Sequence, residues 1–168
     1  MKAKAVIEGR ALKYGDNINT DIISPPQYME LPVSDAAAYA MGAVDPGFAE
    51  KAGTANIFVA GKNLGSGSSR ETAPLTLKYL GIEAVVAEFF ARIFYRNCIN
   101  IGIPAIECAD AGRISEGDEL EVDTAAGVIR NLAKKESYAC SRIPAHISAL
   151  IEDGGLIGHL RVEKEGRK

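Results

Sequence analysis

Short apolar runs alternate with amphipathic segments through the middle of the chain. Residues 56–60 (NIFVA) and 84–87 (AVVA) are apolar and rich in β-branched side chains, which predicts buried strands. Residues 73–80 and 89–101 carry apolar positions at helical spacing, which predicts two helices. Residues 103–107 predict another short strand. This βαβαβ order predicts an α/β fold with parallel strand pairing.

The N-terminal part predicts shorter elements joined by turns. Residues 4–12 alternate loosely and predict a strand, and residues 14–21 are rich in turn formers. Pro25 and Pro26 then exclude a helix at that point. A Ser-Asp pair can cap a short helix over residues 36–41.

The last third changes character. Residues 117–123 alternate polar and apolar positions, as a half-exposed strand does, and residues 124–127 read as a turn into a second strand over 128–130. Residues 144–151 predict a helix that a Gly-Gly pair stops. We expect residues 1–168 to form a single domain.

A glycine-rich stretch joins the first central strand to the first central helix. It covers residues 61–71 (GKNLGSGSSRE). Glycines let successive backbone N–H groups point the same way, and the helix N-terminus adds partial positive charge. The planar guanidinium of Arg70 suits a carboxylate or a phosphate. The stretch therefore predicts an anion-binding loop.

Pro74 decides which residues of this loop can face the anion. If Ser68 capped the helix in a capping box, Pro74 would fall where the helix needs a backbone N–H, at a cost of about 3 kcal/mol. A helix that starts at Thr72 or one residue later keeps Pro74 in the first turn, and Thr72 is a suitable N-cap. Ser68, Ser69 and Arg70 then remain in the loop.

Other loops of this kind fit less well. No lysine follows the last glycine, as a nucleotide P-loop requires, and the order of Gly and Ser differs from the G-x-S-x-G elbow of hydrolases. The only histidines, His146 and His159, lie near the C-terminus, and such residues are more often structural than catalytic. The chemistry of the loop is therefore incomplete within this chain.

Composition narrows the compartment and the partners. A net charge of −3 and 7% aromatic residues, with no tryptophan, argue against nucleic-acid binding. No apolar run reaches the roughly 18 residues of a membrane span. Three cysteines, Cys98, Cys108 and Cys140, fit neither a disulfide framework nor a metal motif. We expect a cytoplasmic protein that binds no metal itself.

The glycine-rich loop resembles the G-x-N-F-G-x-G-S-S-R-E signature of the swivel domain of the aconitase superfamily. Residues 15–21 (GDNINTD), 90–97 (FARIFYRN) and 100–104 (NIGIP) agree with the same family in order and spacing. The nearest match is the family of separate small subunits of 3-isopropylmalate dehydratase. This resemblance implies a swivelling β/β/α three-layer domain that closes over a large subunit. It also implies that the large subunit carries a [4Fe–4S] cluster and that this chain binds no cofactor.

The resemblance further implies a reaction and residue roles. The family removes water from a 2-hydroxy acid and adds it back at the neighbouring carbon. By this resemblance Ser68 is the alkoxide-type base, while Ser69 and Arg70 bind the substrate carboxylate, with Gly67 and Asn63 beside them. A serine hydroxyl is a poor base in water and needs oriented donors and a fixed cation, which the loop can supply. The small subunit alone is expected to be inactive, and its homo-oligomerisation is left open.

Two departures from the family pattern bear on the substrate. Thr72 stands where the family usually has histidine. By this resemblance the loop that selects the substrate reads Tyr28, Met29, Glu30 and Leu31, and it lacks the arginine that would suit a third carboxylate. An alkyl-substituted malate is therefore expected, and tricarboxylates such as citrate or homocitrate are disfavoured.

Further polar residues have two readings each. Thr20, Asp16 and Asp21 can support the site or merely form turns. Arg92 and Arg96 lie one turn apart on a predicted helix, so they share a face. That face is either solvated charge or a contact with the large subunit. The family motif at residues 90–97 also suggests a supporting role for Arg92 at the site.

Several hypotheses for the function follow. The first is the small subunit of a dehydratase that interconverts 2- and 3-isopropylmalate in leucine biosynthesis. Close alternatives are small subunits of 2-methylmalate (citramalate), 2,3-dimethylmalate or maleate hydratase and, with less support, homoaconitase. A different class is a stand-alone carboxylate-binding module without chemistry.

Overall fold

The computed structural model describes residues 6–166, whose strands form one seven-stranded sheet. The strands are β1 (Val6–Lys13), β2 (Ile57–Val59), β3 (Ala84–Ala87), β4 (Ala105–Glu107), β5 (Glu119–Asp123), β6 (Val128–Asn131) and β7 (Glu136–Ala139). The α-helices are α1 (Thr20–Ile23), α2 (Val33–Ala36), α3 (Phe48–Lys51), α4 (Thr72–Tyr79), α5 (Arg92–Asn100), α6 (Ala145–Glu152) and α7 (Leu156–Gly166). The 3-10 helices are η1 (Pro26–Tyr28), η2 (Ala37–Tyr39) and η3 (Ala111–Arg113).

The sheet has a parallel half and an antiparallel half. Its strand order is β4-β3-β2-β1-β5-β6-β7. β1 to β4 run parallel, with Ala11 opposite Ile57 and Ile57 opposite Ala84. β5, β6 and β7 add antiparallel neighbours on the other side of β1. The α/β class and the parallel βαβαβ order predicted from the sequence are confirmed.

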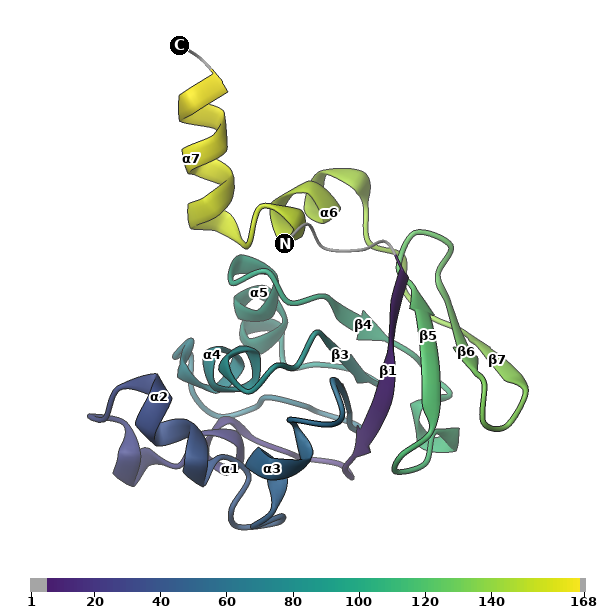
Figure 1. The fold of residues 1–168 in the computed structure, drawn as a ribbon, viewed down its shortest axis with the longest axis horizontal. Coiled ribbons are helices and arrows are strands. Elements are labelled where there is room, and N and C mark those ends of the chain that lie inside the picture. The colour runs from purple at the N-terminus through teal and green to yellow at the C-terminus, as the bar shows by residue number, and fades with distance from the viewer. Residues whose placement is uncertain (1–5, 167–168) are drawn as a thin grey trace.

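The parallel strands form the core. Every residue of β2 and β3 is fully buried, which explains why these strands read as unbroken apolar runs. The ring of Phe58 lies 5.0 Å from that of Tyr14 and 5.9 Å from that of Phe48. α4 and α5 pack side by side against this half of the sheet (Figure 1).

The C-terminal helices lie at one end of the molecule. α6 packs against α5, and α7 projects away from the rest of the chain (Figure 1). Ile157 and Leu160 of α7 are exposed, and α7 has no buried residue. No helix among residues 6–166 combines the length and the apolar character needed to cross a membrane.

The sheet curls until its two edges meet. Just after β7, the Ser141 N–H donates to the carbonyl oxygen of Glu107 in β4 at 2.8 Å. The Ser141 hydroxyl accepts the Glu107 N–H at 2.9 Å. The edge strands β4 and β7 are therefore linked, and little free edge remains at this point.

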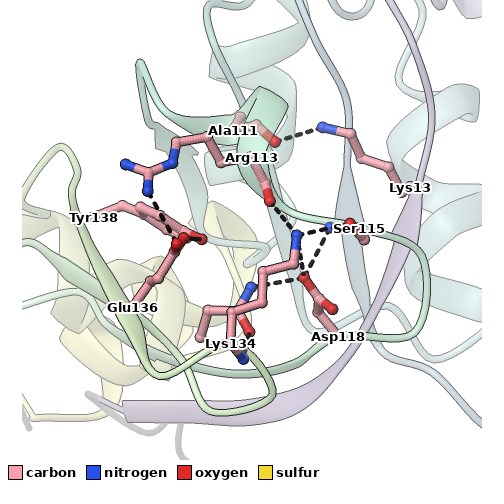
Figure 2. Close-up of polar contacts among 9 residues, drawn as sticks. Lys13, Ala111, Arg113, Ser115, Asp118, Lys134, Glu136 and Tyr138 are labelled. Atoms are coloured by element: carbon pink, nitrogen blue, oxygen red, sulfur yellow. Dashed lines mark hydrogen bonds and ion pairs between the residues drawn. The ribbon is translucent and has the colours of Figure 1, made fainter.

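A polar cluster fastens the segment after β4 to the β6–β7 hairpin (Figure 2). The Lys134 ammonium donates to the Arg113 carbonyl at 2.5 Å and to the Ser115 hydroxyl at 2.7 Å. It also lies 3.3 Å from the Asp118 carboxylate. The Arg113 guanidinium lies 3.1 Å from the Glu136 carboxylate. These contacts connect the segment after β4, which is one edge strand of the sheet, to the hairpin that ends in β7, the other edge strand.

Several sequence predictions need correction at helix starts. The helix expected over residues 36–41 begins earlier, at Val33 directly after Pro32, and no side chain caps it. The exclusion of a helix by the two prolines was wrong, because Pro26 begins the short helix η1, where a missing N–H costs nothing.

The other differences concern starts and missed elements. α5 begins three residues later than residue 89, because the backbones of Phe89 and Ala91 bond to Leu64 in the glycine-rich loop. The first strand is β1, and residues 4 and 5 of its expected range lie outside the described residues. The elements α1, α3, β7 and α7 were not predicted.

Candidate functional site

The glycine-rich loop leaves the carboxyl end of β2 and lies beside the segment that follows β1. The N–H of Gly65 donates to the Ile18 carbonyl at 2.7 Å, and the N–H of Thr20 donates to the Ser66 carbonyl at 2.9 Å. Carboxyl ends of neighbouring parallel strands meet at one edge of a sheet, where ligands commonly bind. The turn motif at residues 15–21 and the loop at residues 61–71 therefore form one unit.

Two glycines of this loop are required by close packing. Gly65 has a left-handed φ of +84°, and a Cβ there would lie 2.0 Å from Cγ of Phe94. A Cβ at Gly61 would lie 1.9 Å from Oδ1 of Asp16. That same oxygen accepts the Lys62 N–H at 2.7 Å. The Asp16 carboxylate thus links the segment that follows β1 to the glycine-rich loop.

Ser68 lies at the centre of a set of hydrogen bonds. Its N–H donates to Oγ1 of the buried Thr20 at 2.9 Å. Its own Oγ accepts from Nε of Arg70 at 2.9 Å and from the backbone N–H of Arg70 at 3.2 Å. A cationic donor and a backbone donor are therefore aimed at one serine oxygen, an arrangement that stabilises negative charge.

The loop faces outward. Ser69 and Arg70 are exposed, and Ser68 is half-buried. α4 begins at Thr72, so Pro74 occupies its first turn and residues 68–70 lie outside the helix, as predicted. The N-cap prediction for Thr72 was wrong, because Glu71 holds that position and makes no capping hydrogen bond with its side chain.

The expected specificity loop lies next to Arg70. Nη1 of Arg70 contacts Sδ of Met29. Tyr28 is held by a stacked ring contact with Tyr39, with centroids 3.8 Å apart. Leu31 is 43% exposed, so its apolar side chain is available for contact. The Glu30 side chain is exposed and makes no hydrogen bond or ion pair with another described residue.

The other predicted site residues differ in position. Asn63 has a left-handed φ of 58°, and its Nδ2 donates to Oδ1 of Asn17 at 3.1 Å, so it braces the turn motif. Gly67 has a φ of +113°, and a Cβ there would lie 3.2 Å from Oγ1 of Thr20. Asp21 is exposed in the first turn of α1, and within residues 6–166 its carboxylate has no bonding partner.

Arg92 lies on the wall of a cleft whose lining does not include Ser68. This cleft has a volume of about 590 Å³ and lies between α5, α6 and the end of β4. Arg92 and Arg96 are both exposed there, and neither guanidinium pairs with another described residue. Burial and the nearby Glu107 carboxylate raise the pKa of Tyr95, which lines the same cleft.

Sequence reasoning missed Asn97. This residue of α5 is 7% exposed, and its Nδ2 donates to the Ser69 carbonyl oxygen at 2.9 Å. A buried amide among the apolar neighbours Phe94 and Cys98 is the sequence signal that could have drawn attention to it.

The three cysteines, Cys98, Cys108 and Cys140, are free thiols. Burial raises the pKa of the Cys98 and Cys108 thiols and raises that of Cys140 to about 11. Within residues 6–166, no three His, Cys, Asp or Glu side chains gather as metal ligands would.

The family assignment follows from comparison with known proteins. Residues 16–111, more than half of the chain, match the model of the aconitase C-terminal domain. The chain therefore belongs to the aconitase C-terminal domain family.

Two relatives and one solved structure are similar to this chain over most of its length. The chain is 46% identical to the 3-isopropylmalate dehydratase small subunit of Clostridium beijerinckii, over 92% of this chain and 98% of that one. It is 44% identical to the isopropylmalate/citramalate isomerase small subunit of Methanocaldococcus jannaschii, over 94% and 95%. The crystal structure of a 3-isopropylmalate dehydratase (leuD) from that archaeon superposes with a TM-score of 0.90 at 37% identity, covering 96% and 97%.

Proposed function

We propose that this chain is the small subunit of a hydro-lyase that interconverts 2-isopropylmalate and 3-isopropylmalate in leucine biosynthesis. A large subunit holding a [4Fe–4S] cluster completes the enzyme. The relatives named above support the enzyme class. The observation that carries the chemistry is the pair of Arg70 donors on Ser68 Oγ, at 2.9 and 3.2 Å, in an outward-facing loop.

In this proposal Ser68 acts as the base. Its alkoxide takes the proton from the carbon next to a substrate carboxylate, while the two Arg70 donors stabilise the charge on Oγ before transfer. Loss of this proton and of the hydroxyl on the neighbouring carbon gives an unsaturated dicarboxylate and one water. Return of water with the hydroxyl on the other carbon gives the isomer. The cluster, when bound in the partner, supplies a Lewis acid for the hydroxyl.

Ser69 and Arg70 bind the substrate carboxylate. The Ser69 hydroxyl is exposed and has no partner among residues 6–166, so it is free to donate. The Arg70 guanidinium keeps donors beyond Nε, and a carboxylate can accept two of them at once. Met29 lies against the same guanidinium and offers an apolar wall for an alkyl substituent.

A second candidate substrate is 2-methylmalate (citramalate). The specific support is the relative named as an isopropylmalate/citramalate isomerase small subunit. Methyl and isopropyl groups are both apolar and can both contact Met29, and each methylene changes transition-state binding by only about 1–3 kcal/mol. Thr72 replaces the histidine that the family usually has beside the loop, so the residue at this position does not decide between these alkylmalates.

Reconstitution tests the proposal. This chain, mixed with a cluster-loaded large subunit of a 3-isopropylmalate dehydratase, should convert 2-isopropylmalate to 3-isopropylmalate, and each subunit alone should not. Citramalate and citrate serve as comparison substrates, with citrate expected to be the poorest. Dicarboxylate binding by this chain without turnover of any alkylmalate in the mixture would instead support a stand-alone binding module.

A further inference from the structure

The orientation of one peptide plane in the loop depends on α5. Asn97 is buried there, and its Nδ2 holds the Ser69 carbonyl oxygen at 2.9 Å. Its neighbours Phe94 and Cys98 are almost fully buried, so packing fixes this part of α5. The Ser69 side chain is exposed, and its hydroxyl makes no hydrogen bond to another described residue that would support the loop at this point.

The planarity of the peptide bond turns this anchor into a constraint on Ser68. The described residues contain no cis peptide bond, and in a trans peptide the carbonyl and the following N–H point in opposite directions. With the Ser69 carbonyl pinned toward α5, the Arg70 N–H points away from it, toward Ser68 Oγ at 3.2 Å. The buried amide thus sets the direction of a donor that it does not touch.

We propose that Asn97 is a positioning residue for proton abstraction: it holds the Ser69–Arg70 peptide so that the Arg70 N–H stabilises the Ser68 alkoxide. This inference rests on the proposed function, because it gives Ser68 the role of base. Asn97 itself contacts neither the substrate nor the reacting oxygen.

The test uses the complex with a large subunit and isosteric changes at Asn97. Asn97→Asp and Asn97→Leu keep the approximate shape but remove the donor, and the carboxylate also repels the Ser69 carbonyl. Loss of a preorganised donor costs about 10²–10³ in kcat, so an indirect loss should lower kcat by about tenfold or more. KM should change by less than about threefold, and the ascending limb of the pH–rate profile, which reports deprotonation of the base, should move to higher pH.

Cys98→Ala is the matched control, since it disturbs the packing of α5 without touching Ser69. It should lower the melting temperature but keep the wild-type kcat and pH profile. In the isolated chain, the Arg70 amide should become more mobile by nitrogen-15 relaxation in Asn97→Asp and not in Cys98→Ala. This measurement remains informative if the Leu variant fails to fold.

Two results separate this inference from the proposed function. Wild-type kcat, pH profile and Arg70 mobility in Asn97→Asp, together with an inactive Ser68→Ala, would overturn the positioning role alone. Full activity of Ser68→Ala would overturn both.

Discussion

Arg70 joins the parts of the proposed site at the scale of single residues. Its Nε and backbone N–H reach Ser68 Oγ, and its Nη1 faces Met29. A lysine would keep the positive charge but lose the planar fork and the Nε donor. The geometry of the guanidinium, as well as its charge, is therefore what the site uses.

Arg70→Lys should lower kcat/KM for isopropylmalate by about 10- to 100-fold, since a hydrogen bond to a charged group contributes roughly 1.5–3 kcal/mol. Steady-state kinetics of the reconstituted enzyme measure this effect. Arg10→Lys, an exposed arginine of β1 paired with Glu119, is the control and should behave as wild type. An unchanged kcat/KM in Arg70→Lys would show that Arg70 does not bind the substrate carboxylate.

Residue-level prediction from the sequence succeeded where the constraint was local. Pro74 alone indicated that Ser68 to Arg70 stay outside the helix, and the structure agrees. The hydrogen bond that Ser68 donates to Thr20 and the one that Asn97 donates to Ser69 join residues 48 and 28 positions apart. No local pattern specifies such contacts, which is why Asn97 was missed.

Among the elements, the segment around η1 determines what lies beside Arg70. Tyr28 is fixed by stacking on Tyr39, so Met29 is presented at the guanidinium from a stable turn. The chemistry of the side chain at position 29 should then influence which substituent the site accepts.

Met29→Arg should raise the turnover of a tricarboxylate relative to an alkylmalate by about tenfold, because a second guanidinium can pair with the third carboxylate. Competition assays with citrate and 2-isopropylmalate measure the ratio. Gln27→Arg adds the same charge at an exposed position of η1 and should leave the ratio unchanged. An unchanged ranking in Met29→Arg would mean that this segment does not select the substrate.

The face of α5 that carries Arg92 and Arg96 offers a second element-level prediction. Both guanidinium groups are exposed and unpaired among the described residues, beside an open cleft. If this face meets the large subunit, Arg96→Glu should weaken subunit association by about tenfold or more. The new carboxylate would face like charge across the interface, which costs affinity. Analytical ultracentrifugation of the mixture measures this, with Lys135→Glu on the β6–β7 hairpin as the control. Equal dissociation constants for Arg96→Glu and wild type would show that these arginines are solvated and do not contact the large subunit.

The sequence predicted long apolar elements better than short or polar ones. β2 and β3 are buried throughout, so their composition alone revealed them. β7 has only one fully buried residue, Tyr138, and α7 has none, so neither produces a clear apolar pattern. The start of α5 moved because Phe89 and Ala91 pair with Leu64, a contact between distant segments.

For the whole molecule, the polar cluster of Figure 2 connects the segment after β4 to the β6–β7 hairpin. Burial alone would raise the pKa of Asp118, but hydrogen bonds from the Ser115 N–H, the Asn131 amide and the Lys134 ammonium outweigh burial and lower it. A carboxyl group whose pKa is lower in the folded state stabilises the fold above its unfolded value of 3.8, and this stabilisation is lost as the pH falls further.

The free energy of unfolding of the isolated chain should therefore decrease as the pH falls below about 4. Asp118→Asn should show a smaller acid-induced decrease, because this group no longer titrates. Urea unfolding at several pH values from 3 to 7 measures the difference, and Glu83→Gln, an exposed carboxylate, should retain the wild-type dependence. Parallel pH curves for Asp118→Asn and wild type would show that this cluster does not control acid stability.

The whole molecule presents its glycine-rich loop at the surface instead of enclosing it. Ser68 is half-buried and Arg70 is exposed, and no three His, Cys, Asp or Glu side chains of residues 6–166 gather as metal ligands would. The proposed function explains this exposure, because the large subunit would cover the loop and supply the remaining chemistry. The account therefore depends on one claim, that Ser68 acts as the base within a two-subunit enzyme.

The most direct measurement of that claim is kcat for isomerisation of 2-isopropylmalate by the complex containing Ser68→Ala, with Ser66→Ala as the control in the same loop. General base catalysis contributes about 10²–10⁴ in rate, so Ser68→Ala should lose activity by that factor while KM and subunit association stay near wild type. Ser66→Ala should remain active. A Ser68→Ala complex that isomerises the substrate within about threefold of the wild-type rate would contradict the account.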